Sequence, residues 1–351
     1  MRWRSKYAWI LAASLFLVAC NKSDGVDEAI ADDPTEVEED TGQEEVAEEL
    51  KYKLPFTGEM VAEQSTQRPV LVTINNQPEA RPQSGLQQAD IVFEMLAEGE
   101  GTRLLALYQS EMPETVGPIR SARKYFIDVA KGLDAFYVAH GYSPEAKTML
   151  NQGVVDHING MQYDGIYFKR ASHRKAPHNS YLSQENFERA ADKLKLDLET
   201  NDFIAYSFYE NDENVRIGMA APAVNVKISN AKSYQSRYFY FEDEGTYERS
   251  QGGSLTIDEQ TNERLAISNL LFFEIPHRVV DQEGRRELDL TAGGRAYVAQ
   301  KGMLREVKWE NRAGQLVAIE SDGSDVLLVP GQTWVHFVPT NPGIATAVTL
   351  E

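Results

Sequence analysis

Cysteine is nearly absent from this sequence. The 351 residues contain a single cysteine, Cys20, so no internal disulfide and no cysteine-ligated metal cluster can form. Positive charge is also scarce, because 35 Lys and Arg stand against 54 Asp and Glu, a formal net charge of −19. Nucleic-acid binding requires a basic surface, so this charge balance argues against a nucleic-acid partner.

Signatures of metal binding and of nucleophilic catalysis are missing too. No two histidines stand at the spacing of a His-Glu-x-x-His helix, so we predict no metal and no cofactor. There is no Gly-x-Ser-x-Gly elbow. Ser121 lies between two arginines and is either a nucleophile or the cap of the following helix, and we expect the cap. The sequence therefore favours a protein without enzymatic activity and leaves the enzyme alternative open.

A bacterial lipoprotein signal is predicted at the amino terminus. Three basic residues precede an apolar stretch, Ala8 to Ala19, that is too short to span a membrane comfortably. The stretch ends in Leu17-Val18-Ala19-Cys20, which resembles a lipobox. We predict that residues 1–19 are removed, that Cys20 carries lipid, palmitate included, and that the chain is anchored outside the cytoplasm. An ordinary secretory signal with a chance cysteine, or an uncleaved anchor, is the alternative.

An acidic segment follows the expected lipidation site. Residues 24–49 contain 13 Asp and Glu, no Lys or Arg and no aromatic residue. Such a segment cannot bury enough apolar surface to offset its ordering entropy, and like charges extend it. We predict that residues 20–53 are the lipidated cysteine and a disordered spacer. An acidic binding tail is the alternative.

Residues 54–210 form the predicted first domain, in which strands alternate with helices. Apolar runs rich in β-branched residues predict strands, and amphipathic or capped segments between them predict helices. The expected strands are 68–74, 91–96, 103–108 and 135–141, and the expected helices are 121–132, 144–150 and 185–198. This order favours a mixed α/β sheet that is parallel in part.

Residues 211–351 form the predicted second domain, which is mainly antiparallel β. Short strand-like runs are separated by turns such as Asp322-Gly323 and Pro330-Gly331. The fold class is therefore α+β. Trp309 and Trp334 are expected in the core. Four charged residues are expected in solvated turns: Glu248, Arg249, Asp258 and Glu259.

Several segments in a fixed order carry a family resemblance. They are Arg68-Pro69-Val70, Ala80-Arg81-Pro82-Gln83-Ser84-Gly85-Leu86, Ala89-Asp90-Ile91-Val92, Val116-Gly117-Pro118-Ile119-Arg120-Ser121-Ala122-Arg123 and Ala176-Pro177-His178-Asn179. Together they resemble the YerB-like lipoproteins, and the likeness runs from about Leu54 to Val338. The resemblance implies a two-domain secreted bacterial lipoprotein. It implies no reaction, because the family has no settled activity.

A cluster of basic residues is the candidate binding site. The turn Gly117-Pro118 delivers Arg120 and Arg123 to the start of a predicted helix, where free N–H groups and guanidiniums suit an anion. The alternative is that the arginines only pair with Glu94, Glu98 and Asp128. The predicted anion pocket comprises Arg103, Arg120, Arg123, Arg170, Arg174 and His178.

Three functions are compatible with these patterns. The leading prediction is a lipid-anchored lipoprotein that binds a cell-envelope component or an envelope protein through the anion pocket. The alternative is a transferase or hydrolase acting on a phosphorylated or glycosylated cell-wall precursor, with Arg103, Arg120 and Arg123 holding pyrophosphate. The third is a structural adaptor in which the arginines only shape a domain interface.

Overall fold

The structure is a computed structural model that describes residues 50–200 and 205–351. The predicted signal peptide, Cys20 and the acidic segment up to residue 49 lie outside the described residues. Residues 50–351 form one compact unit. Within the described ranges, no helix combines the length and the apolar character that crossing a membrane would require. The expected domain boundary near residue 210 stays a prediction.

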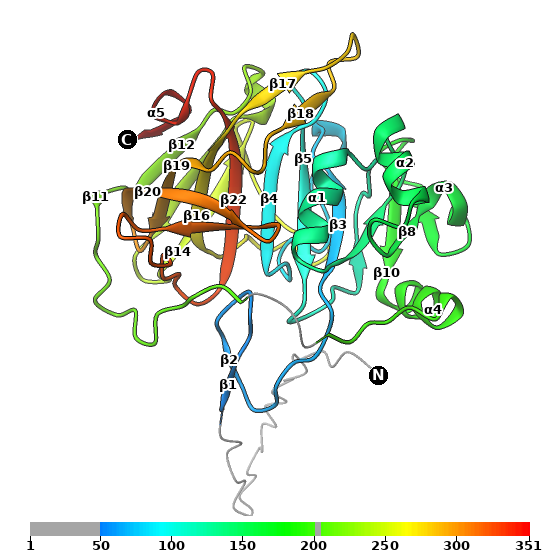
Figure 1. Cartoon of the computed structure of the whole chain (residues 1–351), viewed down its shortest axis with the longest axis horizontal. Helices are drawn as coiled ribbons and strands as arrows, with labels where there is room; N and C mark the ends of the chain where they lie inside the picture. Colours follow the sequence, from blue (N-terminus) through cyan, green and yellow to red (C-terminus); the bar gives the residue numbers. More distant parts are fainter. Residues whose placement is uncertain (1–49, 201–204) are drawn as a thin grey trace, which may run out of the picture. The chain divides into compact units, whose positions relative to one another are not determined.

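A large sheet of 16 strands organises the fold (Figure 1). The part from the first half of the chain has the order β4-β5-β3-β7-β8. The strands β4, β5 and β3 pair antiparallel, whereas β3, β7 and β8 pair parallel, as the alternation of strands with helices predicted. Their bounds are β3 (Val70–Asn75), β4 (Ile91–Leu96), β5 (Thr102–Tyr108), β7 (Phe136–Ala139) and β8 (His157–Asn159).

Helices and a small second sheet surround this part. The helices are η1 (Pro78–Ala80), α1 (Lys124–Gly132), α2 (Pro144–Asn151), α3 (Gly160–Tyr163) and α4 (Gln184–Leu194). The second sheet is three-stranded, with β10 (Ser180–Ser183) between β6 (Thr115–Val116) and β9 (Phe168–Arg170). The expectation that Ser121 caps α1 was wrong. Arg123 precedes the helix, and the Ser121 hydroxyl donates to the backbone carbonyl of His140 at 3.2 Å.

The second half of the chain is rich in strands, which confirms the α+β class. Most pairs are antiparallel, and β16 pairs parallel with β22. The main strands are β12 (Ala223–Val226), β13 (Ser236–Phe241), β14 (Thr246–Gln251), β16 (Ile267–Ile275), β19 (Gly294–Gln300), β20 (Met303–Arg312), β21 (Gln315–Ile319), β22 (Gln332–Pro339) and β23 (Val348–Leu350).

Short elements complete the described chain. A two-stranded sheet is formed by β17 (His277–Val279) and β18 (Arg286–Leu288), and another by β1 (Tyr52–Lys53) and β2 (Met60–Val61). The remaining elements are β11 (Met219–Ala220), β15 (Ser254–Leu255), η2 (Lys232–Tyr234) and α5 (Ile344–Ala347).

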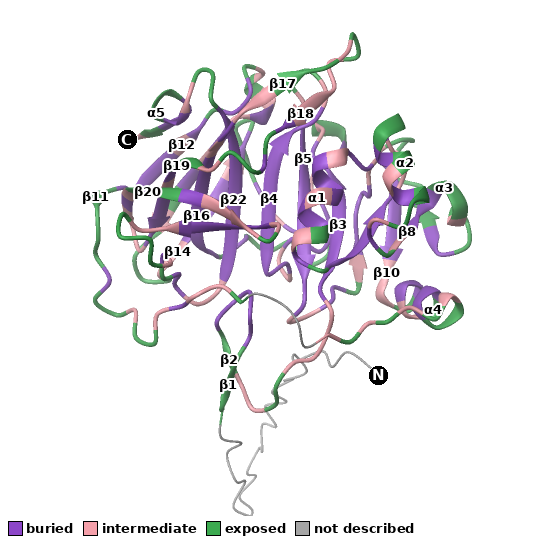
Figure 2. Ribbon diagram, in the orientation of Figure 1, coloured by how far each residue is buried: buried purple, intermediate pink, exposed green. Residues whose placement is uncertain are grey.

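Strand β22 joins the two halves into one sheet. Residues 333–336 pair parallel with residues 91–94 of β4, while the other edge of β22 pairs with β16. One face of this junction is apolar: Phe93 and Phe337 pack edge to face and belong to the same buried core cluster as Phe126 of α1. The strands at the junction are buried along most of their length (Figure 2). Trp309 and Trp334 are 1% and 0% exposed, so their predicted core placement is confirmed. Glu94 and His336 are paired across the opposite face.

Candidate functional site

The predicted arginines Arg103 and Arg120 lie near one another where β3 ends and β5 begins. Arg103 is the second residue of β5 and lies opposite Asn75, the last residue of β3. The segment before α1 runs along the end of β3, since Asn75 N–H donates to the Pro118 carbonyl and Arg120 N–H to the Thr73 carbonyl, both at 2.8 Å. This geometry brings the charge of Arg120 close to that of Arg103.

Glu98 already compensates two of the predicted arginines. Its carboxylate forms ion pairs with Arg103 at 2.8 Å and with Arg123. Arg103 also donates to the Ser121 carbonyl at 2.6 Å. The side chains of Arg103 and Arg123 are 7% and 9% exposed, so these pairs are largely screened from water. For these two residues the structural pairing that the sequence left open is what the geometry shows.

Arg170 and Arg174 are likewise held by partners of their own. Arg170 binds Asp164 at 2.9 Å. Arg174 donates to Glu259 at 2.8 Å and to the Pro82 carbonyl at 2.6 Å, so it ties its loop to two other segments. These contacts leave neither guanidinium without an acceptor.

Arg120 is different, because its guanidinium has no hydrogen-bond or ion-pair partner among residues 50–200 and 205–351. The residue is half-buried. Burial lowers the pKa of Arg120 to about 10, and the nearby charge of Arg103 acts in the same direction. An arginine in this state has donors to spare, and its repulsion from Arg103 is relieved when an anion binds.

His178 contributes a second donor near the end of β3. Asn75 accepts a hydrogen bond from Gln77 N–H at its side-chain oxygen, so its amide nitrogen faces His178 Nδ1 at 3.0 Å. Nδ1 is then the acceptor, and a neutral His178 carries its proton on Nε2. We call the residues Asn75, Arg103, Arg120, His140 and His178 the Arg120 cluster. Burial and the charge of Arg170 lower the pKa of His140, and Arg120 lies close enough to lower it further.

His140 of this cluster does not activate a serine. His140 Nδ1 lies 2.7 Å from the Ser180 hydroxyl, but Arg170 donates to its Nε2 at 2.9 Å. The proton of a neutral His140 therefore sits on Nδ1 and points at Ser180, which is the opposite of a general base. Ser180 is also buried. No group of three potential metal ligands occurs in the described ranges.

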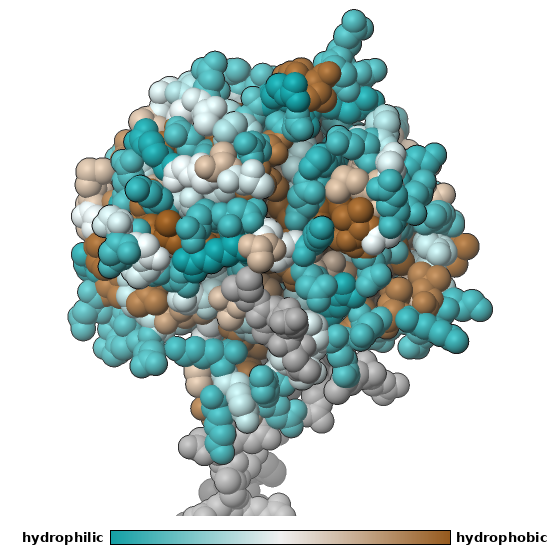
Figure 3. Space-filling model, viewed as in Figure 1, coloured by the Kyte–Doolittle hydropathy of each residue, from teal (hydrophilic) through white to brown (hydrophobic). Residues whose placement is uncertain are grey.

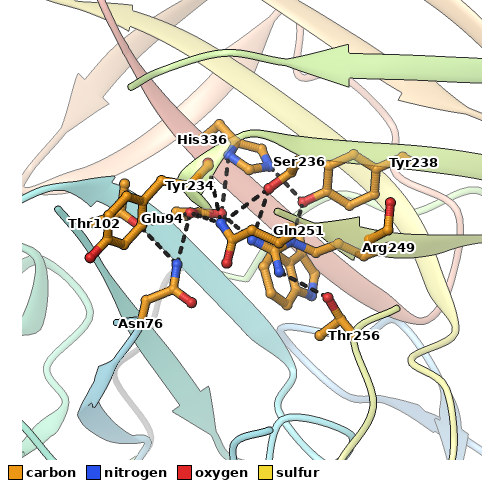
Figure 4. Close-up of polar contacts among 12 residues, drawn as sticks. Asn76, Glu94, Thr102, Tyr234, Ser236, Tyr238, Arg249, Gln251, Thr256 and His336 are labelled. Atoms are coloured by element: carbon orange, nitrogen blue, oxygen red, sulfur yellow. Dashed lines mark hydrogen bonds and ion pairs between the residues drawn. The ribbon is translucent and has the colours of Figure 1, made fainter. Parts of the chain in front are cut away.

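A buried charged cluster, which sequence reasoning missed, lies between the two halves of the chain. Glu94 of β4 accepts from Arg249 of β14 at 2.7 Å, and His336 of β22 lies 3.7 Å from the same carboxylate (Figure 4). Glu94 and Arg249 side chains are 0% and 2% exposed. The expectation that Arg249 lies in a solvated turn was therefore wrong.

Further donors and acceptors satisfy this cluster. The other Glu94 oxygen accepts hydrogen bonds from Asn76, Thr102 and Gln251, at 3.0, 2.9 and 2.8 Å. Arg249 Nε donates to the Tyr238 hydroxyl at 3.1 Å, and that hydroxyl lies 2.7 Å from His336 Nε2. Burial alone would raise the pKa of Glu94, but the Arg249 guanidinium holds it below its ordinary value.

Asp258 and Glu259 were also expected in a solvated turn, and this too was wrong. Asp258 is buried and accepts from Gly85 N–H at 2.7 Å. Glu259 accepts from the Ser84 hydroxyl and from Arg174, at 2.9 and 2.8 Å. These carboxylates hold the loop around Ser84. Acidic side chains in a turn-like stretch gave no sequence signal of that role.

The architecture defines an α+β protein in which two segments of the chain share one sheet. Comparison with family models matches both segments. Residues 56–197 match "Protein of unknown function (DUF3048) N-terminal domain", and residues 224–335 match the corresponding C-terminal domain. The chain belongs to the DUF3048 family.

A relative and a solved structure confirm the predicted resemblance to YerB-like proteins. The chain is 42% identical over 295 residues to "Putative lipoprotein YerB" of Bacillus subtilis (strain 168), which covers 82% of this chain and 87% of the relative. It also matches the crystal structure of YerB protein from Bacillus subtilis with a TM-score of 0.78 and 39% identity. That match covers 86% of this chain and 100% of the solved one.

Proposed function

We propose that the chain is a lipid-anchored protein on the extracytoplasmic face of the cell membrane that binds an anionic cell-envelope component, or an anionic envelope protein, through the Arg120 cluster. The observation that carries the binding proposal is the Arg120 guanidinium, half-buried beside Arg103 and without an acceptor in the described ranges. A guanidinium binds carboxylate or phosphate oxygens in a bidentate geometry. Arg103, Arg123, Arg170 and Arg174 then position the surrounding loops.

The anion proposal is tested by replacing Arg120. Arg120→Gln should weaken binding of inorganic pyrophosphate about tenfold or more, since hydrogen bonds to a charged group contribute about 1.5–3 kcal/mol. The free energy of unfolding should change by less than about 0.5 kcal/mol, because no folded-state partner is lost. Calorimetric titration of the full-length chain measures the first quantity, and urea unfolding the second. The matched control is Arg189→Gln on the exposed face of α4.

Two results would count against the Arg120 cluster as an anion site. One is equal pyrophosphate affinity in Arg120→Gln and the unmodified chain. The other is the absence of binding heat with pyrophosphate, phosphate and acetate alike. That result would mean that the cluster does not recognise its partner through an anionic group.

The proposed anchor is supported by the lipobox-like Leu17-Val18-Ala19-Cys20 and by the similarity to a putative lipoprotein of Bacillus subtilis. Cys20→Ser should abolish incorporation of labelled palmitate into the chain and leave it at its precursor size, because the acylated thiol and the cut before it are both lost. Labelling of growing bacterial cells followed by membrane fractionation measures this. Ser23→Ala is the control and should be labelled normally. Undiminished label in Cys20→Ser would exclude lipidation at this residue.

A further inference from the structure

A second candidate site lies away from the Arg120 cluster. A cavity of about 860 Å³ is bordered by α1, by β17, by β18 and the residues that follow it, and by the turn between β20 and β21. This volume is in the usual range of ligand pockets, about 300–1,000 Å³. In the space-filling view, apolar surface is visible in the furrow between α1 and these strands (Figure 3). No residue of the Arg120 cluster lines it.

The cavity joins the two segments that the family models match. Leu288 and Leu290 line it and are 5% and 7% exposed, so they provide an apolar base. The end of α1 and the turn touch through their backbones, because a Cβ on Gly132 would lie 2.0 Å from the Gly314 carbonyl oxygen. This contact fixes α1 against the turn, which gives the cavity a preformed shape.

Charged residues line the cavity in pairs, and one residue of each sign is left over. Lys124 pairs with Asp128 at 2.6 Å, and the Arg278 guanidinium pairs with the Glu287 carboxylate. Lys131 of α1 is exposed and has no partner among the described residues. This leaves one free cation on the α1 side.

The leftover acid lies on the other side. Asp289 follows β18 and accepts from Thr291 N–H at 3.0 Å and from its hydroxyl at 2.7 Å, bonds that lower its pKa and keep it ionised. No cation pairs with it in the described part of the chain. The cavity therefore offers one free positive and one free negative group on different elements, above an apolar base.

We infer that this cavity binds a short unmodified peptide, whose carboxylate pairs with Lys131, whose ammonium pairs with Asp289 and whose apolar side chains pack on Leu288 and Leu290. Charge complementarity selects a ligand that carries both charges, and the apolar base selects one with apolar side chains. The lining includes no Phe, Tyr or Trp ring on which a sugar could stack, which favours a peptide over a carbohydrate. The inference does not rest on the proposed anion site.

The test uses the full-length chain and a pool of tripeptides built from leucine, valine and alanine. The pool is prepared unmodified, amino-terminally acetylated, and carboxyl-terminally amidated. The unmodified pool should bind, and each blocking group should weaken binding about threefold to fivefold, the upper range for an exposed charge pair. Saturation-transfer NMR detects binding, and calorimetry of the strongest peptide measures the affinity.

Two variants assign each charge to its partner. Lys131→Met should weaken binding of the unmodified peptide and remove the penalty of amidation, while the penalty of acetylation stays. Asp289→Asn should do the reverse. Lys193→Met, an exposed lysine of α4 outside the cavity, should bind like the unmodified chain. Absence of binding by the whole pool, or equal binding of blocked and unmodified peptides, would overturn the inference.

Discussion

Replacing Arg249 by methionine should lower the free energy of unfolding by about 3–5 kcal/mol, because it leaves the Glu94 carboxylate buried without its cation. Glu94 is 0% exposed, and its Oε2 lies 2.7 Å from the Arg249 guanidinium. Arg249 also donates to Thr256 and Ser236, at 3.0 and 2.9 Å. Methionine fills similar space but supplies none of these donors. Urea unfolding of the full-length chain at neutral pH measures the loss.

The control for this prediction is a solvent-exposed ion pair of the same protein. Arg295 and Glu306 lie 2.8 Å apart with side chains 48% and 53% exposed, so Arg295→Met should cost less than about 1 kcal/mol. The double variant Glu94→Gln with Arg249→Met should recover part of the stability that Arg249→Met loses, because it no longer buries an unpaired charge. If Arg249→Met were no less stable than Arg295→Met, the buried pair would not hold the two halves together.

The position of this pair explains why its loss should be costly. Glu94 lies on β4, Arg249 on β14 and His336 on β22, so the cluster bridges both segments that the family models match. The same strands form the continuous sheet. A slip of β22 by one residue against β4 would turn His336 to the other face and bury Glu94 against an apolar side chain. The cluster therefore favours one register at the junction.

The strands of the first half were predictable because their sequences are mainly apolar and rich in β-branched residues. Strands 70–75, 91–96 and 102–108 are buried along their whole length, as such runs predict for strands covered on both faces. The role of β22 was not predictable. Its residues read as one more apolar strand, and nothing in them indicates pairing with a strand some 240 residues away.

The buried charges were hidden by the same alternation that reveals strands. In β14, Tyr247, Arg249 and Gln251 point inward, and the inward residues are mostly polar. Alternation of polar and apolar residues identifies the solvent face only when the buried face is apolar. Arg120 and Arg123 were singled out because they follow the Gly117-Pro118 turn. Pairing of the arginines with Glu98 was the alternative that the sequence left open, and it depends on distances that spacing does not give.

Acidification from pH 6.5 to 4 should destabilise the folded chain by about 3 kcal/mol through His336 alone. Burial lowers the pKa of His336 from 6.5 to about 4. In this window the unfolded chain binds a proton that the folded chain does not. The stability that a neutral His336 contributes is thus complete above pH 6.5 and is lost as the pH falls toward 4. Urea unfolding measured at several pH values follows this loss.

The assignment to His336 is tested by the difference in the free energy of unfolding between the unmodified chain and His336→Gln. The glutamine amide oxygen can still accept a hydrogen bond from the Tyr238 hydroxyl. Burial raises the pKa of Asp90 to about 7, so Asp90 titrates in the same window with the opposite sign, and His277, with a pKa of about 4, adds to the effect of His336. Both groups are present in both proteins, so their effects cancel in the difference. The free energy of unfolding of the unmodified chain, relative to that of the variant, should fall by about 3 kcal/mol as the pH is lowered from 6.5 to 4. A constant difference across that window would mean that His336 is already protonated in the fold, paired with Glu94.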